Sequence, residues 1–447
     1  MKEDLTQGPV IKTMLRFAVP MIFGNLLQQC YNIADTLIVG RFLGAGALAA
    51  VGSAFSLMTF LTSILLGLAM GSGTVFSIRF GQKDQLGLKE GILASFVLLS
   101  IVTALLNTAV FMGLDWIIWI LRTPANLVAT MREYLSVIFI GLAGIFLFNF
   151  FTSLLRSLGN SVVPLLFLAV SAVLNIALDL WFVAGLNRGA AGAAEATVIS
   201  QYVSGIGIAV YTRIKYPELL RRDKKVRFRL SRVKEITGFS ALTCLQQSIM
   251  NLGILMVQGL VNSFGTTIMA AFAAAVKIDA FAYLPVQDFG NAFSIFTAQN
   301  YGAKQTERIK KGIRAALTAS VAFSLMVSFC VFVFAEPLMT LFINAEETAV
   351  IEEGVRYLHI EGAFYFLIGI LFLFYGLYRA LAKPGMSVVL TIASLGIRVA
   401  LAYALSAIPA FGIAGIWWSV PIGWLLADVL GTVYYFVKRK SLLRGGL

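Results

Sequence analysis

The sequence predicts an all-α membrane protein with twelve transmembrane helices arranged as two six-helix repeats. Three observations lead to this fold class: an apolar composition, apolar runs of about 20 residues along the whole chain, and an internal repeat. Of the 447 residues, 59% are hydrophobic and 13% are charged, whereas soluble domains carry about 25% charged residues. The composition therefore excludes an ordinary soluble globular protein.

Each predicted transmembrane helix lies on an apolar run long enough to cross a hydrocarbon layer of about 30 Å. In the first half the runs are 14–39, 47–77, 90–112, 132–155, 162–184 and 190–213. In the second half they are 236–261, 267–297, 313–334, 355–380, 386–407 and 411–437. We expect residues 1–213 to form an N-terminal lobe and residues 236–447 a C-terminal lobe, joined by a basic cytoplasmic linker at 214–235.

The two halves of the chain are copies of one repeating unit. When the halves are aligned, Phe80-Gly81 corresponds to Tyr301-Gly302, and Arg156 corresponds to Arg379. Repeated membrane bundles are typical of transporters whose halves move against each other around a central site. Four polar residues of the first copy are replaced in the second: Asp35, Asn175, Asp179 and Thr197 fall on Met256, Arg398, Ala402 and Val420. A polar set retained in one half indicates where a coupling ion would bind.

Basic residues alternate between the two ends of the predicted helices. With a cytoplasmic N-terminus, 28 of the 35 Lys and Arg residues lie inside and 5 lie outside, which is the positive-inside pattern. It predicts that both termini are cytoplasmic, and it explains the net charge of +13 without nucleic-acid binding. The basic segment 221–229 is interpreted as a solvated linker, with a contact to anionic lipids as the alternative.

Motifs for enzymatic chemistry are missing from the sequence. It contains no Walker A loop, no His-Glu-x-x-His and no Gly-x-Ser-x-Gly. The three cysteines lie in apolar runs and give no disulfide framework, and the one histidine excludes a multi-histidine metal centre. We therefore expect neither an enzyme nor a cofactor, and any active transport would use an ion gradient.

Polar residues at membrane depth form the candidate cation site. A carboxylate in the hydrocarbon region costs roughly 2.5–3.5 kcal/mol on insertion scales, so it indicates function. Asn175 and Asp179 share a helical face, while Asp35 and Thr197 lie at similar depth in their own helices. Alternatively, the side chain of Asp35 reaches the outer membrane surface, because Asp35 lies about one turn from that end of its helix. Such a set can load and release a proton, or bind sodium through oxygen ligands.

A second set of residues forms the candidate substrate site. From the first and fourth helices we select Gln28, Tyr31, Asn32, Asn149 and Thr152. From the eighth helix we select Lys277 and Asp288, which are eleven residues apart and share a face unless Pro285 disturbs it. With Asp279 and Arg398 they are interpreted either as a substrate or gating network or as internal charge pairs. A lysine here leaves zwitterionic, anionic and neutral substrates open.

A motif in the first helix resembles that of the multidrug and toxic compound extrusion (MATE) family. It reads Pro20-x4-Asn25-x2-Gln28-Gln29-x-Tyr31-Asn32-x2-Asp35, followed by Val39-Gly40-Arg41-x2-Gly44. Asn175-x3-Asp179, Thr197 and the stretch Ala298-Gln299-Asn300-Tyr301-Gly302-Ala303 match other landmarks of the family. The resemblance covers essentially the whole chain and is closest to the prokaryotic DinF-like branch.

The resemblance implies a fold, a function and a set of site residues. The fold would be two six-helix bundles forming a V-shaped cleft, with Pro20 as a bend point. The function would be export of drugs or organic cations in exchange for protons or sodium. Asp35, Asn175, Asp179 and Thr197 would form the proton or sodium site in the N-terminal lobe.

The main hypothesis is thus a monomeric secondary transporter in the prokaryotic cytoplasmic membrane, with a small-molecule substrate and membrane lipids as its partners. One alternative is a flippase for a lipid-linked substrate, from the same superfamily. The twelve-helix count and the two basic residues within spans, Lys277 and Arg398, argue against a flippase. Another alternative is a passive channel or a sensor, which would not need a protonatable pair at one depth.

Overall fold

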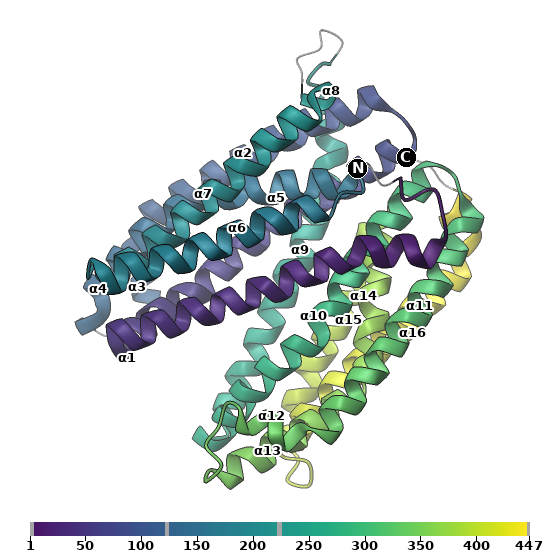
Figure 1. Ribbon diagram of the computed structural model, residues 1–447. Helices are drawn as coiled ribbons and strands as arrows, with labels where there is room; N and C mark the ends of the chain where they lie inside the picture. Colours follow the sequence, from purple (N-terminus) through teal and green to yellow (C-terminus); the bar gives the residue numbers. More distant parts are fainter. Residues whose placement is uncertain (1–3, 121–124, 221–225, 445–447) are drawn as a thin grey trace. The chain divides into compact units, whose positions relative to one another are not determined.

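The computed structural model describes residues 4–120, 125–220 and 226–444, and these are almost entirely helical (Figure 1). Within these residues, eleven helices are long and apolar enough to cross a membrane. A bent pair, α13 (Thr348–Gly362) and α14 (Tyr365–Ala380), meets at 51°, and counted as one broken span it brings the total to twelve. The predicted all-helical membrane fold is confirmed, and each predicted run overlaps one of these spans.

The chain packs into two compact units. The N-terminal unit contains Phe23–Cys244, and the C-terminal unit contains Leu5–Ile22 with Leu245–Leu447. The helices up to the middle of the chain are α1 (Val10–Gly81), α2 (Gln85–Met112), α3 (Leu114–Ile120), α4 (Val128–Ile138), α5 (Leu142–Ser157), α6 (Val162–Asp179), α7 (Gly189–Lys215), α8 (Pro217–Leu220) and α9 (Leu230–Asn262). Short helical segments also lie at Ala125–Leu127, Phe139–Gly141 and Leu180–Gly185.

The remaining helices belong to the C-terminal unit. They are α10 (Thr266–Gly302), α11 (Thr306–Val333), α12 (Ala335–Thr340), α13, α14, α15 (Pro384–Ser406) and α16 (Ile413–Arg444). The helix α1 holds two of the predicted spans, because Gly44 has a φ of 81° and interrupts the helical backbone. A positive φ of this kind is favourable for glycine, which lacks a Cβ atom.

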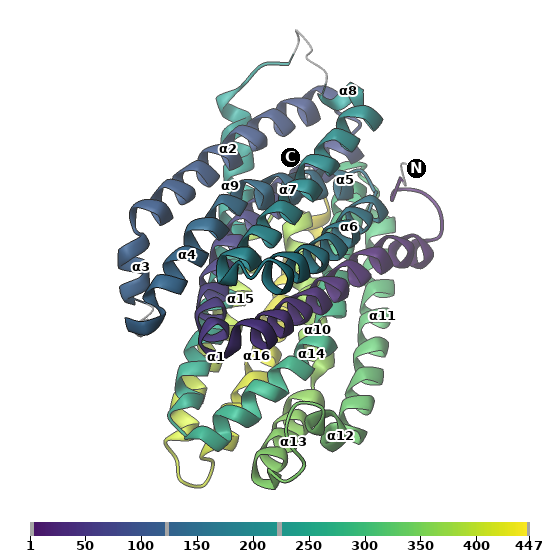
Figure 2. The ribbon, with the colours of Figure 1, turned by 60° about the vertical axis from the view of Figure 1, so that its left-hand side comes forward.

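The packing within each unit determines which side chains can meet. In the N-terminal unit α7 packs against α4, α5 and α6 (Figure 2). In the C-terminal unit α10 packs against α11, α13 and α14, while α15 packs against α14 and α16. Polar residues on the facing sides of these helices are therefore brought together inside each unit.

The helices α1 and α9 each contribute to both units. In α1 the division between the units follows Ile22, and in α9 it follows Cys244; these two positions differ by one residue from an exact match in the repeat. This division differs from the predicted lobes, which began the C-terminal lobe at residue 236 and joined it by a linker at 214–235. The first part of α9 belongs to the N-terminal unit because Gly71 allows close backbone contact: a Cβ atom there would lie 2.5 Å from Ser240 Cα. Residues 221–225 of the predicted linker lie outside the described residues.

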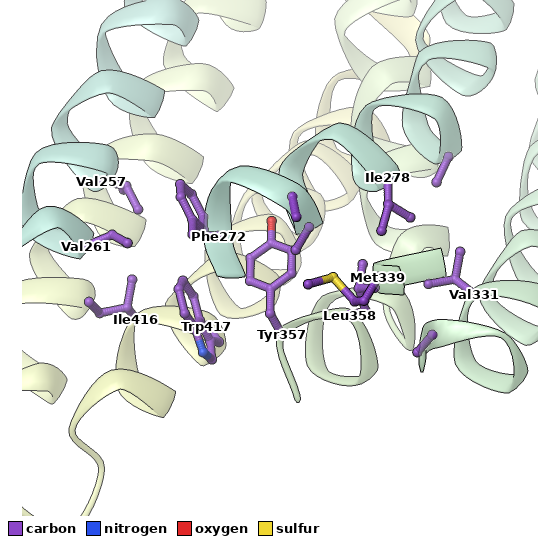
Figure 3. Close-up of a cluster of buried hydrophobic side chains, with 14 of the residues drawn as sticks. Val257, Val261, Phe272, Ile278, Val331, Met339, Tyr357, Leu358, Ile416 and Trp417 are labelled. Carbon is purple, nitrogen blue, oxygen red and sulfur yellow. The ribbon is translucent and has the colours of Figure 1, made fainter. Parts of the chain in front are cut away.

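An apolar cluster stabilises the C-terminal unit (Figure 3). The rings of Phe272 and Trp417 stack with their centroids 5.4 Å apart, and Tyr357 meets Trp417 edge-on at 5.0 Å. Trp417 is fully buried, and its Nε1 donates a hydrogen bond to Glu353 at 2.6 Å. The indole therefore ties α16 to α13 through both its apolar ring and its polar atom.

Candidate functional site

The four predicted cation-site residues come together inside the N-terminal unit. Asp179 is the last residue of α6, and Asn175 lies one turn before it. The Nδ2 of Asn175 donates a hydrogen bond to the Oγ1 of Thr197 in α7 at 3.3 Å. Thr197 in turn donates to the carbonyl of Ala193 at 3.1 Å. Asp35 of α1 supplies a second carboxyl group, which lies within interaction range of that of Asp179.

The helix geometry changes directly after Asp179. Residues Leu180–Gly185 form a π-helical segment, which continues α6. Wide turns of this kind are rare and are frequent at functional sites. The segment begins directly after Asp179.

Asp179 is fully buried and Asp35 is half-buried, and their facing carboxyl groups are short of hydrogen-bond donors. Asp179 has no exposed surface and Asn175 is 2% exposed. Among the described residues, no hydrogen-bond donor reaches either carboxyl oxygen of Asp179, the Oδ1 of Asp35 or the Oδ1 of Asn175. Two carboxyl groups in contact are favourable only when one carries a proton or when a cation lies between them. The arrangement is therefore suited to binding a single positive charge.

Two tyrosines flank the acidic pair. Tyr31 of α1 interacts with the side chain of Gln28 and, electrostatically, with both Asp35 and Asp179. Tyr134 of α4 is buried and interacts with the same two carboxyl groups. Sequence reasoning missed Tyr134. The repeat could have found it, because the alignment that matches Arg156 with Arg379 also matches Tyr134 with Tyr357 of the second copy.

The other substrate candidates of the N-terminal unit lie in separate environments. Gln28 is exposed and Asn32 is half-buried on α1. The Nδ2 of Asn149 in α5 donates to the carbonyl of Ile145 at 2.9 Å. Thr152 is buried, and its hydroxyl has no partner among the described residues. Of this set, Gln28 and Tyr31 are the two that the structure joins by a side-chain interaction.

Lys277 and Asp288 of α10 do not share an environment. Lys277 is exposed, and its Nζ lies 5.8 Å from the ring centroid of Phe342. Asp288 is buried. Pro285 lies between them in the helix, and a proline removes one helical hydrogen bond and commonly bends the axis.

A polar cluster that the sequence only partly predicted lies in the C-terminal unit. Asp279 accepts hydrogen bonds from the hydroxyls of Tyr365 and Tyr357, the latter at 3.3 Å. Glu361 is 1% exposed and interacts with Asp279, and Arg398 interacts electrostatically with both carboxyl groups. Glu361 lies in the last turn of α13, next to the bend between α13 and α14. The interpretation of Arg398 as an internal charge partner agrees with this arrangement, whereas Glu361 was missed although it is an acidic residue in an apolar run.

A further buried carboxyl group and the absence of a metal cluster complete the description. Asp428 of α16 is 6% exposed, and neither carboxyl oxygen has a hydrogen-bond partner among the described residues. It interacts electrostatically with Tyr375 of α14. Within the described part of the chain, no group of three or more His, Cys, Asp or Glu side chains could hold a metal ion.

Comparison with known proteins places this geometry in context. The sequence profile of the family described as MatE matches residues 20–181 and 241–404. The two segments start 221 residues apart (241 − 20) and end 223 residues apart (404 − 181). The same spacings relate Phe80 to Tyr301 (221) and Arg156 to Arg379 (223) in the internal repeat. The profile thus recognises both copies of the repeat.

Full-length relatives and solved structures agree with this match. The probable multidrug resistance protein YpnP of Bacillus subtilis (strain 168) is 30% identical, over 99% of this chain and 98% of that protein. The FAD transporter of Shewanella oneidensis is 24% identical, over 98% of this chain and 96% of that protein. A solved structure described as the outward-facing conformation of a multidrug resistance MATE family transporter of the MOP superfamily has a TM-score of 0.90, with 24% identity, and covers 99% of this chain and 98% of its own.

Proposed function

Because the chain belongs to the multidrug and toxic compound extrusion (MATE) family of membrane transporters, we propose that it is a secondary efflux transporter exchanging drugs or organic cations for protons or sodium. The observation that carries this proposal is the contact between the carboxyl groups of Asp35 and Asp179, in which both oxygens of Asp179 and the Oδ1 of Asp35 lack donors among the described residues. Relatives named as multidrug resistance proteins support the class of substrate. The acidic pair of Asp35 and Asp179 supports the coupling of transport to protons or sodium.

The proposed coupling follows from the charge of the acidic pair. With a proton or sodium ion bound, Asp35 and Asp179 together carry one net negative charge and can stay buried. After release, two adjacent negative charges favour a conformation in which water reaches them, since desolvating a charge is costly. Asn175 and Thr197 offer oxygen atoms beside the pair and hold each other in place. Each charge that crosses the membrane contributes about 2.3 kcal/mol per 100 mV.

We also propose the orientation and location of the protein. The excess of basic residues at one end of the helices supports cytoplasmic termini, in the cytoplasmic membrane of a prokaryote. A monomer is sufficient for this mechanism, because one chain contains both repeats.

A transport assay with an imposed ion gradient tests the proposal. The protein is reconstituted in liposomes, and a fluorescent organic cation is followed under a proton or a sodium gradient. The variant Asp179→Asn should lose gradient-driven movement, and the driving gradient identifies the ion. Asp115→Asn is the matched control, because Asp115 is 77% exposed at its side chain and pairs with Arg132 outside the site. The control should transport like the parent.

Other results of the same assay would contradict the proposal. Movement that ignores both gradients and the Asp179→Asn change would reject the cation site and favour a passive channel. If no cation moves under any gradient, the flippase hypothesis gains support, and a lipid-linked substrate is the next to test.

A second candidate substrate class is an anionic or zwitterionic molecule. It is supported by the exposed ammonium group of Lys277 in the span α10 and by the relative that is named as an FAD transporter. If Lys277 binds such a substrate, Lys277→Gln should reduce transport of a flavin dinucleotide and leave transport of an organic cation unchanged. An equal effect on both substrates would exclude a role in charge recognition.

A further inference from the structure

We propose that the C-terminal unit holds a specific binding site for an anionic phospholipid, in a groove between the start of α1 and the first half of α11. The groove is shallow and open on one side, with a volume of about 550 Å³. Its lining includes Ile11 of α1 and, from α11, Lys311, Arg314, Ala315, Ala319 and Ala322. Both walls belong to the C-terminal unit, so the site is complete within one unit.

The wall formed by the start of α1 is fixed in place by hydrogen bonds. The backbone nitrogen of Leu5 donates to Gln299 at 3.1 Å, and Asn300 donates to the carbonyl of Leu5 at 3.2 Å. The guanidinium of Arg308 donates to the carbonyls of Leu5, Gln7 and Gly8, the last two at 2.6 Å. A groove held in this way loses little entropy when a ligand binds, which favours affinity.

The mouth of the groove is basic. Lys311 and Arg314 are exposed, and neither has an ion-pair partner among the described residues. The nearby carboxylate of Glu307 pairs with Lys310, whose Nζ lies 2.6 Å away, and interacts with Lys311 only at longer range. A second groove of about 910 Å³ continues from Ile11 and Lys311. The two exposed cations are therefore available to a phosphate group.

Beyond its basic mouth the groove is mostly apolar, and Thr318 is the one uncharged polar residue in its lining. Ala315, Ala319 and Ala322 follow Lys311 at four, eight and eleven residues, so all four lie on one face of α11. At 1.5 Å per residue, the stripe extends about 16 Å from Lys311, which is half the hydrocarbon layer of about 30 Å. Small side chains leave room for an acyl chain along this length. The combination of a basic mouth and an apolar trough matches a diacyl phospholipid better than free phosphate.

The location of the groove agrees with this ligand. It lies at the end of the helices where basic residues are concentrated, which the proposed orientation puts in the cytoplasmic leaflet. Anionic lipids are found in that leaflet, and basic pockets between helices on that side bind their headgroups. The choice of leaflet rests on the proposed orientation, whereas lipid binding itself can be measured without any transport.

Native mass spectrometry of the purified protein tests the site. The protein is titrated in detergent with dioleoyl phosphatidylglycerol, and the dissociation constant of the first bound lipid is measured. Lys311→Gln with Arg314→Gln should weaken this binding about 30-fold, which corresponds to about 1 kcal/mol for each basic residue. The matched control is Arg213→Gln with Lys215→Gln, which removes the same two charges from the exposed end of α7 in the N-terminal unit. The control should bind the lipid like the parent.

A third variant separates the lipid from a simple anion. Ala319→Phe keeps both charges and fills the trough, so it should also weaken phosphatidylglycerol binding. Unfolding temperatures measured without lipid check that each variant is folded. The proposal is overturned if the control loses as much affinity as the groove variant. It is also overturned if Ala319→Phe has no effect, or if glycerol phosphate without acyl chains competes as well as the lipid.

Discussion

Replacing Gly71 with alanine should loosen the first part of α9 from the N-terminal unit. A Cβ atom at Gly71 would lie 2.5 Å from the Cα of Ser240 and 2.8 Å from the carbonyl of Phe239, whereas ordinary contacts begin at 3.4 Å. The helices would have to separate by about 1 Å, and overpacking of this kind costs about 1–3 kcal/mol. Alanine recovers about 0.5–1 kcal/mol of helix stability, so the net loss should be about 1–2 kcal/mol.

The same contact is strengthened by serine hydroxyls, which the variant would also disturb. Ser95 donates to Ser72 at 2.7 Å, Ser72 and Ser240 lie 3.0 Å apart, and Ser240 donates to the carbonyl of Leu68 at 2.9 Å. These bonds depend on the close approach of α1 and α9 at Gly71. Because α9 continues into the C-terminal unit, Gly71→Ala should reduce transport as well as stability.

Thermal unfolding in detergent measures the effect. A domain of about 200 residues loses about 2–4 °C of unfolding temperature per kcal/mol, so Gly71→Ala should unfold about 2–8 °C below the parent. Gly238→Ala is the matched control, because Gly238 is exposed on α9, the helix that Gly71 of α1 contacts, and a Cβ atom there would meet nothing within 4 Å. The control should be as stable as the parent or slightly more stable. An unchanged unfolding temperature for Gly71→Ala, or an equal loss in the control, would refute the reasoning.

Three further substitutions test other parts of the structure. Glu90→Gln should cost about 1–2 kcal/mol, less than a fully buried pair, because Glu90 is 1% exposed but its partners Arg229 and Arg232 are 53% and 23% exposed. Unfolding temperatures should fall equally in low and high salt, and a loss confined to low salt would contradict burial. Tyr365→Phe should destabilise by about 1–3 kcal/mol, since it removes one donor from the buried Asp279, and an unchanged unfolding temperature would argue against that bond. Trp417→Ala should cost about 3–5 kcal/mol and reduce the yield of folded monodisperse protein, and a normal yield would contradict the packing in Figure 3.

The helices could be predicted from the sequence, whereas their breaks and their division between units could not. Apolar runs identify the segments that cross a membrane. Inside lipid a helix satisfies its own backbone hydrogen bonds, and this requirement is the same for every chain. The run 355–380 is apolar across residues 363–364, where α13 and α14 meet at 51°. The bend depends on neighbouring helices, and so does the contact at Gly71. A single apolar run carries no information about such neighbours.

The site was predictable where the residues share a helix or a depth. Asn175 and Asp179 follow from helical periodicity, and Asp35 follows from its distance to the end of its span. Tyr134 was missed because nothing in its own segment indicates which face of α4 turns inward. Lys277 and Asp288 were placed on one face by spacing, but one is exposed and the other is buried. Periodicity predicts the angle between two side chains only in a straight helix. A proline between them bends the helix, so the predicted angle no longer holds.

The repeat also supports our proposal that the coupling ion binds in the N-terminal unit. Aligning the two copies matches Tyr134 with Tyr357 and Asn175 with Arg398, so both units have a tyrosine beside carboxyl groups. In the C-terminal unit, the carboxyl groups interact with the fixed positive charge of Arg398.

A guanidinium stays protonated in proteins and cannot be released, so the cluster around Asp279 already holds its counter-charge. In the N-terminal unit the matching residue is the neutral Asn175, which leaves the acidic pair without a built-in cation. In the proposed exchange the positive charge comes from solution in each cycle, and Asp35 with Asp179 is the pair that we propose binds it.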